Sequence, residues 1–289
     1  RPPLDEDFAW ADIVVPSPGV PRHHPLLAGA KRVVSEIEVA SWMLTGTLIG
    51  ITGTNGKTTT TTLVHRILEA QGFDAGIGGN ISPPLISLAD RDPRFVAAEI
   101  SSFQLEWIES FRPHIAVCLN ITPDHLDRYP SMDEYVFYKM RIFENQTPGD
   151  IAIVNRDDAY LGNADLRARR ALFSTEGPTS GDGAYVRDGR VVFTGSIAGI
   201  GPRIPAAGTV GSGVIEDMLA SALAGRFLGV LVETMEEVFM NFRVIHHRFE
   251  HVATVGGVRF VDDSKATNVG ALDKALATLD SPAVLILGG

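Results

Sequence analysis

Cysteine is nearly absent from this chain of 289 residues, and no hydrophobic run in it is long. The single thiol, Cys118, excludes an internal disulfide and a cysteine-based metal cluster, and it fits a reducing compartment. The longest apolar stretch, residues 218–232, contains Ser221 and Arg226 and falls short of the roughly 20 apolar residues that a bilayer requires. We therefore expect a cytoplasmic protein without a membrane span.

Basic residues are also scarce. Lys and Arg total 25 against 35 Asp and Glu, so the formal charge is −10. This balance argues against a broad electropositive face, and we expect no nucleic-acid partner. Any anionic ligand must therefore be held by a local site. The hydrophobic fraction of 45% is ordinary for a folded globular chain.

Short β-branched runs alternate with amphipathic segments, which is typical of βα units around a mostly parallel sheet. The predicted class is α/β, and the length argues for two or three domains. The pair Asp188-Gly189 predicts a hairpin over residues 185–192 in a peripheral β element. The predicted strands are residues 12–15, 47–52, 95–100, 114–121, 150–155, 258–261 and 283–287. The predicted helices are residues 57–71, 103–111, 133–145, 216–228, 234–242 and 269–279.

The strongest local signal is GTNGKTT at residues 53–59, between a predicted strand and a predicted helix. Glycines let successive backbone N–H groups point inward, Lys57 supplies a mobile charge, and the Thr58 hydroxyl can ligate Mg²⁺. The usual spacing, GxxxxGK[ST], would require glycine where this chain has Ile51. The pattern favours a nucleoside triphosphate site over a glycine turn beside a solvated lysine.

Two polar residues stand where other predicted strands end. Glu99 interrupts an apolar strand, and its carboxylate is suited to Mg²⁺ at the carboxyl edge of a shared sheet. An edge-strand carboxylate in a surface ion pair would give the same pattern. His125 follows the apolar run 117–121 and is either a ligand or a structural hydrogen-bonding group.

Three further candidates come from charged clusters. Helical spacing by itself predicts that Lys139 is solvated or snorkelling. Arg248 offers a planar fork for a phosphate or a carboxylate, while Asp263 and Lys265 bracket a strand-to-helix turn. Such clusters are also common on protein surfaces, so the residues alone leave both interpretations open.

Together these motifs resemble the Mur ligases. The loop GTNGKT is the form that these enzymes share with folylpolyglutamate synthetases, which accounts for Ile51. Three segments are more similar to the D-glutamate-adding members than to the others, and two more extend the resemblance over nearly the whole chain. The three are SSFQLE (101–106), NITPDHLD (120–127) and DSKATN (263–268), and the two are VPSPGV (15–20) and GGNI (78–81).

The resemblance implies an N-terminal Rossmann-like domain that binds UDP, a central ATPase domain and a C-terminal Rossmann-like domain. The boundaries expected here are residues 1–35, 36–245 and 246–289, with both ends cut from a longer protein. The implied reaction is the ATP-dependent ligation of D-glutamate to UDP-N-acetylmuramoyl-L-alanine through an acyl phosphate, in peptidoglycan precursor synthesis. A monomer that uses ATP and two Mg²⁺ ions is implied. The alternatives are another Mur or folylpolyglutamate synthetase-type ligase and a nucleotide-binding homologue without turnover.

The resemblance also implies roles for individual residues. Asp217 stands where many members carry an asparagine near the adenine, and Lys139 matches a lysine whose carbamylation makes it a carboxylate-like metal ligand. The implied catalytic residues are Lys57, Glu99, His125, Lys139 and Arg248. The implied ATP-binding residues are Gly53, Thr54, Asn55, Gly56, Lys57, Thr58, Thr59, Asp217, Arg248, Asp263 and Lys265. The implied substrate-binding residues are Ser17, Gly19, Asn80, Ser101, His125 and Thr267. The implied metal ligands are Thr58, Glu99, His125 and Lys139.

Overall fold

A computed structural model describes residues 10–243, 247, 249–279 and 282–288. Within these residues, nine strands form one sheet in the order β2-β3-β1-β4-β5-β6-β7-β8-β9. The strands from β2 to β7 pair in parallel, and β8 and β9 add antiparallel at one edge. The predicted α/β class with a mostly parallel sheet is confirmed. The strands are β1 (Thr47–Thr52), β2 (Ala75–Gly79), β3 (Phe95–Glu99), β4 (Ile115–Cys118), β5 (Ile151–Asn155), β6 (Arg169–Ser174), β7 (Gly183–Arg187), β8 (Arg190–Thr194) and β9 (Gly199–Arg203).

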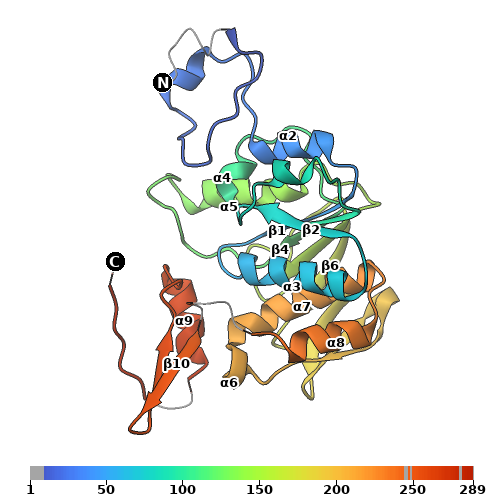
Figure 1. Ribbon diagram of the computed structural model, residues 1–289, viewed down its shortest axis with the longest axis vertical. Helices are drawn as coiled ribbons and strands as arrows, with labels where there is room; N and C mark the ends of the chain where they lie inside the picture. The colour runs from blue at the N-terminus through green and yellow to red at the C-terminus, as the bar shows by residue number, and fades with distance from the viewer. Residues whose placement is uncertain (1–9, 244–246, 248, 280–281, 289) are drawn as a thin grey trace.

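Helices cover both faces of this sheet (Figure 1). One face packs against α3 (Lys57–Ala70), α7 (Ser212–Phe227) and α8 (Val232–Met240), and the other against α2 (Glu36–Met43) and α5 (Met132–Met140). None of the described helices is long and apolar enough to cross a bilayer. The shorter helical elements are η1 (Pro25–Gly29), η2 (Leu85–Leu88), α4 (Ser102–Leu105), η3 (Arg141–Phe143), η4 (Gly195–Ile197) and α6 (Ala207–Val210).

Strand β1 lies in the middle of the parallel part, between β3 and β4. Its side chains alternate between the two faces, so Ile49 and Ile51 join the core under α3 and α7 while Leu48 joins the core under α2 and α5. A strand buried on both faces reads as a continuous apolar run, which is why residues 47–52 are predicted residue for residue. The chain can therefore become polar only beyond the carboxyl end of β1.

The last described segment forms a separate hairpin of β10 (Glu250–Val255) and β11 (Val258–Asp262), followed by α9 (Val269–Ala277). The hairpin and α9 lie beside α6 and α7 (Figure 1). The backbone N–H of Ser212 at the start of α7 donates to the hydroxyl of Thr278 just after α9, at 3.1 Å. This contact brings the C-terminal end of α9 to the same edge of the sheet as the loop after β1.

The predicted hairpin over residues 185–192 is confirmed as β7 and β8. Asp188 and Gly189 both have positive φ angles, of 52° and 69°, which is the backbone that a type I′ turn requires. Two other strand predictions are wrong. Residues 12–15 contribute one bridge, Val14 to Val33, and residues 283–287 form no strand, because no strand in the described part of the chain pairs with them.

The predicted helix over residues 103–111 is also wrong, because α4 ends at Leu105. Beyond it, the backbone N–H groups of Glu109, Ser110 and Phe111 donate to the carboxylate of Glu38 at 2.9, 2.9 and 2.8 Å. These donors would otherwise serve helical carbonyls. Glu38 has no exposed surface, so this buried carboxylate anchors α2 to the chain that leads into β4.

We predict that Glu38→Ala lowers the free energy of unfolding by on the order of 3 kcal/mol or more, because three buried backbone donors lose a charged acceptor. Urea denaturation measures the change. The matched control is Glu109→Ala, which removes only an exposed ion pair with Arg32 and should leave the free energy of unfolding nearly unchanged. Equal losses in the two variants would contradict the anchoring role of Glu38.

Candidate functional site

The loop of residues 53–56 connects β1 to the N-terminus of α3. Gly53 has φ +152° and Gly56, the residue before the first turn of α3, has φ +86° in the left-handed region. A side chain at Gly56 would also meet the carboxylate of Asp217 from α7. Glycine is therefore required at residue 56 both for its backbone conformation and for the close approach of Asp217.

Two lysine side chains converge on the carbonyl oxygen of Gly53. Lys57 Nζ donates to it at 2.9 Å and also to the carbonyl of Thr54 at 2.8 Å, and Lys139 Nζ donates to it at 3.0 Å. Lys139 is only 1% exposed, so the prediction of a solvated lysine from helical spacing is wrong. Burial, together with the nearby charge of Lys57, lowers the pKa of Lys139 to about 7.

Glu99 lies at the carboxyl end of β3, in register with Ile51 of β1. Because β3 is flanked by β2 and β1, the alternative of an edge-strand ion pair is wrong. The amide of Asn80 donates to Oε1 at 2.7 Å, whereas Oε2 is buried without a hydrogen-bond partner among the described residues. A buried carboxylate oxygen left in this state is suited to a cation.

His125 lies in the loop between β4 and α5, on the same side of the sheet. Its φ angle is +53°, and its ring packs on Phe103 with 4.8 Å between ring centroids. Tyr135, which neighbours His125, links this loop to the glycine loop of residues 53–56, called the phosphate loop from here on. The hydroxyls of Tyr135 and Thr54 lie 3.0 Å apart. Lys139 Nζ lies 4.7 Å from the centroid of the same Tyr135 ring. His125 and Lys139 thus flank one aromatic side chain.

The N-terminal segment approaches the His125 loop through Arg128. The Arg128 guanidinium forms a bidentate ion pair with buried Glu106, at 2.8 and 2.7 Å, and donates to the carbonyls of Gly19 and Val20 at 3.3 and 3.0 Å. Gly19 is therefore held close to the His125 loop. Ser17, two residues earlier, is exposed.

Ser101 has a clear structural function. Its hydroxyl accepts from the backbone N–H of Gln104, and the Gln104 side chain returns to the backbone of Ser101, which forms a capping box at the start of α4. A role in substrate binding remains a prediction for Ser101, as it does for Ser17.

A pocket lies between the phosphate loop and the C-terminal segment. Asp217 forms its floor beside Gly56 and accepts a hydrogen bond from the hydroxyl of Thr60 at 3.0 Å. Asp263 and Lys265 reach it from the C-terminal segment, which supplies a second wall. The lining residues are Asn55, Gly56, Thr59, Asn120, Val210, Gly211, Ser212, Gly213, Val214, Asp217, Phe249, Asp263, Lys265, Ala266, Ala271, Ala275 and Thr278.

Two of the remaining predicted residues, Thr58 and Thr267, are not part of this lining. Thr58 is half-buried in the first turn of α3, and Thr267 is exposed on the loop before α9. Arg248 lies outside the described residues, so its predicted role stays a prediction.

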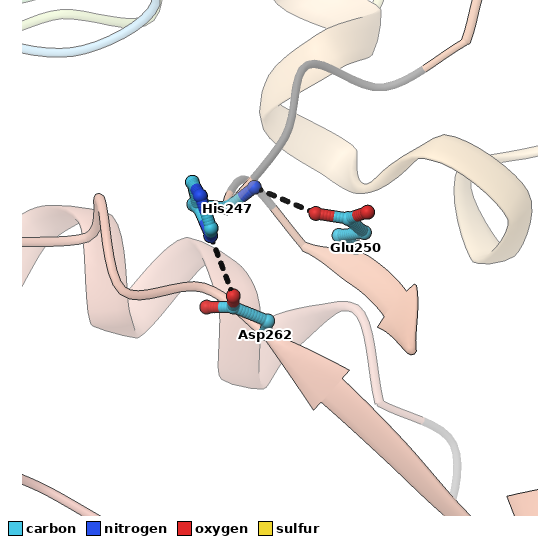
Figure 2. A group of neighbouring side chains, drawn as sticks. All are labelled: His247, Glu250 and Asp262. Carbon is cyan, nitrogen blue, oxygen red and sulfur yellow. Dashed lines mark hydrogen bonds and ion pairs between the residues drawn. The ribbon is translucent and has the colours of Figure 1, made fainter. Parts of the chain in front are cut away.

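His247, Glu250 and Asp262 form a polar cluster next to the pocket (Figure 2). The ring Nδ1 of His247 lies 2.7 Å from the Asp262 carboxylate, and its backbone N–H donates to Glu250 at 2.8 Å. The hydrogen bond from His247 lowers the pKa of Asp262 to about 2. These bonds join the two strands of the hairpin at the end from which Asp263 enters the pocket.

Sequence reasoning assigned no role to two asparagines that shape the loop. The Asn120 amide accepts from the backbone N–H of Asn55 at 2.8 Å and donates to the Asn55 carbonyl at 3.2 Å. Asn268 contacts the side chain of Asn55. Both lie in the segments NITPDHLD and DSKATN, so the available signal was an amide at the end of a predicted strand and one before a predicted helix.

Residues 51–190 match the family model of the Mur ligase middle domain. The matched residues include the phosphate loop, Glu99, His125 and Lys139.

The chain is also homologous to UDP-N-acetylmuramoylalanine--D-glutamate ligases. It is 49% identical to that of Trichlorobacter lovleyi, covering 99% of this chain and 65% of the relative. It is 45% identical to that of Geobacter metallireducens, covering 99% of this chain and 64% of the relative. The chain thus spans somewhat less than two thirds of the length of these relatives.

Solved structures show the same fold at low sequence identity. MurF from Acinetobacter baumannii superposes with a TM-score of 0.65 at 18% identity, covering 84% of this chain and 56% of that one. MurF ligase from Thermotoga maritima in complex with ADP gives a TM-score of 0.62 at 17% identity, covering 96% of this chain and 73% of that one.

We predict that Lys139 makes stability rise with pH above 7. Its pKa is about 7 in the folded chain and 10.5 ordinarily, so between these values the unfolded chain holds the extra proton. Urea denaturation of wild type and Lys139→Met in bicarbonate-free buffer should show wild type gaining stability relative to the variant from pH 7 to 9.5. A difference that does not change with pH would contradict the lowered pKa.

Proposed function

We propose that this chain is the nucleotide-binding part of a cytoplasmic ligase that uses ATP to join D-glutamate to UDP-N-acetylmuramoyl-L-alanine. The observation that carries the proposal is the convergence of Lys57, Lys139 and Glu99 at the carboxyl edge of β1 and β3, beside a glycine loop that opens a helix. The names of the relatives supply the two substrates. We further propose that residues 36–245 form the central domain, with residues 1–35 and 246–289 belonging to flanking domains.

The proposed reaction has two steps. The L-alanyl carboxylate attacks the γ-phosphorus of ATP, which gives an acyl phosphate and ADP. The amine of D-glutamate then attacks the acyl carbon, and phosphate leaves from the tetrahedral intermediate. Negative charge develops on the phosphoryl oxygens in the first step, so the Lys57 ammonium and the helix N-terminus stabilise it by position alone. No protein nucleophile is required.

The residues present fit a divalent cation. Glu99 offers a buried carboxylate oxygen that has no hydrogen-bond partner in the described part of the chain, and the Thr58 hydroxyl lies in the first turn of the helix that begins at Lys57. Mg²⁺ bound there would neutralise charge on the transferred phosphoryl group. His125 and a carbamylated Lys139 are proposed for a second ion.

Carbamylation of Lys139 has a physical basis in its burial. The neutral amine is the form that adds CO₂. With a pKa of about 7, Lys139 is neutral in roughly half of the protein molecules at pH 7. A bond forms between the amine nitrogen and the carbon of CO₂, one proton is released to solvent, and the carbamate anion would face the Lys57 ammonium in place of a second cation. The modification therefore removes a like-charge contact.

The direct test of the proposed function is an assay of ADP formation by the complete ligase of which this chain is the proposed nucleotide-binding part. It should require both UDP-N-acetylmuramoyl-L-alanine and D-glutamate, and a folate acceptor should not replace them. Absence of turnover with the full substrate set would contradict the ligase assignment.

We predict that Glu99→Gln raises the Mg²⁺ concentration needed for half-maximal ATP binding by at least tenfold, because an amide oxygen is a weaker ligand than a carboxylate. Calorimetric titrations of ATP at several Mg²⁺ concentrations measure the shift. Glu109→Gln is the control, since its exposed carboxylate lies in a surface ion pair. Superimposable Mg²⁺ dependence for Glu99→Gln and wild type would remove the metal assignment.

We predict that Lys139→Ala lowers substrate-dependent ADP formation at least tenfold and that a small carboxylic acid such as acetate restores part of it. The added acid can occupy the position of the missing carbamate. Lys57→Ala, which loses an ammonium rather than a carbamate, is the control and should show no rescue. Full activity of Lys139→Ala without acetate would overturn the carbamate proposal.

A further inference from the structure

Asn268 touches the phosphate loop and the His125 loop at the same time. Its carboxamide exchanges two hydrogen bonds with that of Asn55, at 3.2 and 3.0 Å, and its Nδ2 also donates to Asp124 at 3.2 Å. Asn55 precedes Gly56 in the phosphate loop, and Asp124 precedes His125. One side chain from the C-terminal segment thus contacts two loops that are 144 and 213 residues away in sequence.

These contacts join two of the segments that line the pocket. Asn55, Gly56 and Asn120 line one wall, and Asp263, Lys265, Ala266 and Ala271 line the other. Asn268 lies between Ala266 and Ala271 in the segment that supplies the second wall. It does not line the pocket itself, and its amide bonds reach Asn55 on the first wall. This contact, like the hydrogen bond from Ser212 to Thr278, joins the two segments, and a ligand that touches both walls is bound fully only while the segments stay together.

We propose that Asn268 is a positioning residue that holds the C-terminal wall closed over the phosphate loop and so raises the affinity for a nucleoside polyphosphate. The ligand class rests on the proposed function, whereas the closure itself does not. Apparent affinity falls in proportion to the closed fraction of the protein, so loss of the contact weakens binding without removing any group that touches the ligand.

Asn268 also caps α9, and the two roles can be separated. Its Oδ1 accepts from the backbone N–H of Ala271 at 2.9 Å. Serine is an equally good N-cap, but its side chain is shorter and loses the bonds to Asn55 and Asp124. Asn268→Ser therefore keeps the helix cap and removes the contact between the walls.

A second variant tests the same contact through charge. Asn268→Asp also keeps the cap, but it places a carboxylate against that of Asp124. Asp124→Asn relieves the repulsion and retains an acceptor for the backbone N–H of His125, which donates to Asp124 Oδ1 at 2.9 Å. The pair Asn268→Asp with Asp124→Asn should therefore behave more like wild type than Asn268→Asp alone.

The experiment measures closure without nucleotide and then affinity for it. Spin labels on cysteines at the exposed positions Glu69 on α3 and Asp273 on α9 report the separation of the walls by pulsed electron resonance. The native thiol of Cys118 is fully buried and its pKa is raised to about 12, so it does not compete for the label. Calorimetry with ADP and Mg²⁺ gives the affinity of each variant without labels.

We expect Asn268→Ser to add a longer-distance population and to raise the Kd for ADP about tenfold, the effect of one or two lost hydrogen bonds. Asn268→Asp should do the same, with recovery on adding Asp124→Asn. A wild-type distance distribution in both Asn268 variants would overturn the proposal. Absence of ADP binding by wild type would instead refute the proposed function, and the distances would still decide whether Asn268 closes the pocket.

Discussion

The site depends on two ammonium groups that share one acceptor, the carbonyl oxygen of Gly53 at the end of β1. Lys57 reaches it from the helix that the loop opens, and Lys139 reaches it from α5 on the other face of the sheet. Burial of the Lys139 ammonium is costly, and the nearby charge of Lys57 adds to that cost, so the pKa of Lys139 is lowered. An anionic ligand bound beside the two ammonium groups, or a carbamate on Lys139, would replace the repulsion between Lys57 and Lys139 by attraction.

The parallel sheet gathers these groups because its strands all end at one edge. Glu99 follows from β3, the glycine loop from β1, and Asn120 with His125 from β4, although these segments are far apart in the sequence. Each strand is apolar on both faces, so its first polar residues emerge at that edge. The antiparallel strands β8 and β9 lie at the far side of the sheet and contribute nothing to the described pocket lining.

The sequence alone predicts β1, the loop of residues 53–56, α3 and the Asp188-Gly189 hairpin, because each of them depends on residues that are adjacent in the sequence. The burial of Lys139 could not be predicted, since it depends on Tyr135 and Gly53 rather than on helical spacing. The early end of α4 depends on Glu38, more than 60 residues away, and the contact of Asn268 with Asn55 spans still more chain. Strand β2, AGIGG, has too little β propensity to stand out.

The central claim is that the glycine loop and Lys57 form a binding site for a nucleoside triphosphate with Mg²⁺. A calorimetric titration of wild type and Lys57→Ala with Mg²⁺ and ATP tests it most directly, with thermal unfolding as a check on folding. The account predicts saturable binding that ADP displaces, and affinity at least tenfold weaker in a folded Lys57→Ala variant. Equal affinity in the two proteins, or no binding by wild type, would contradict it.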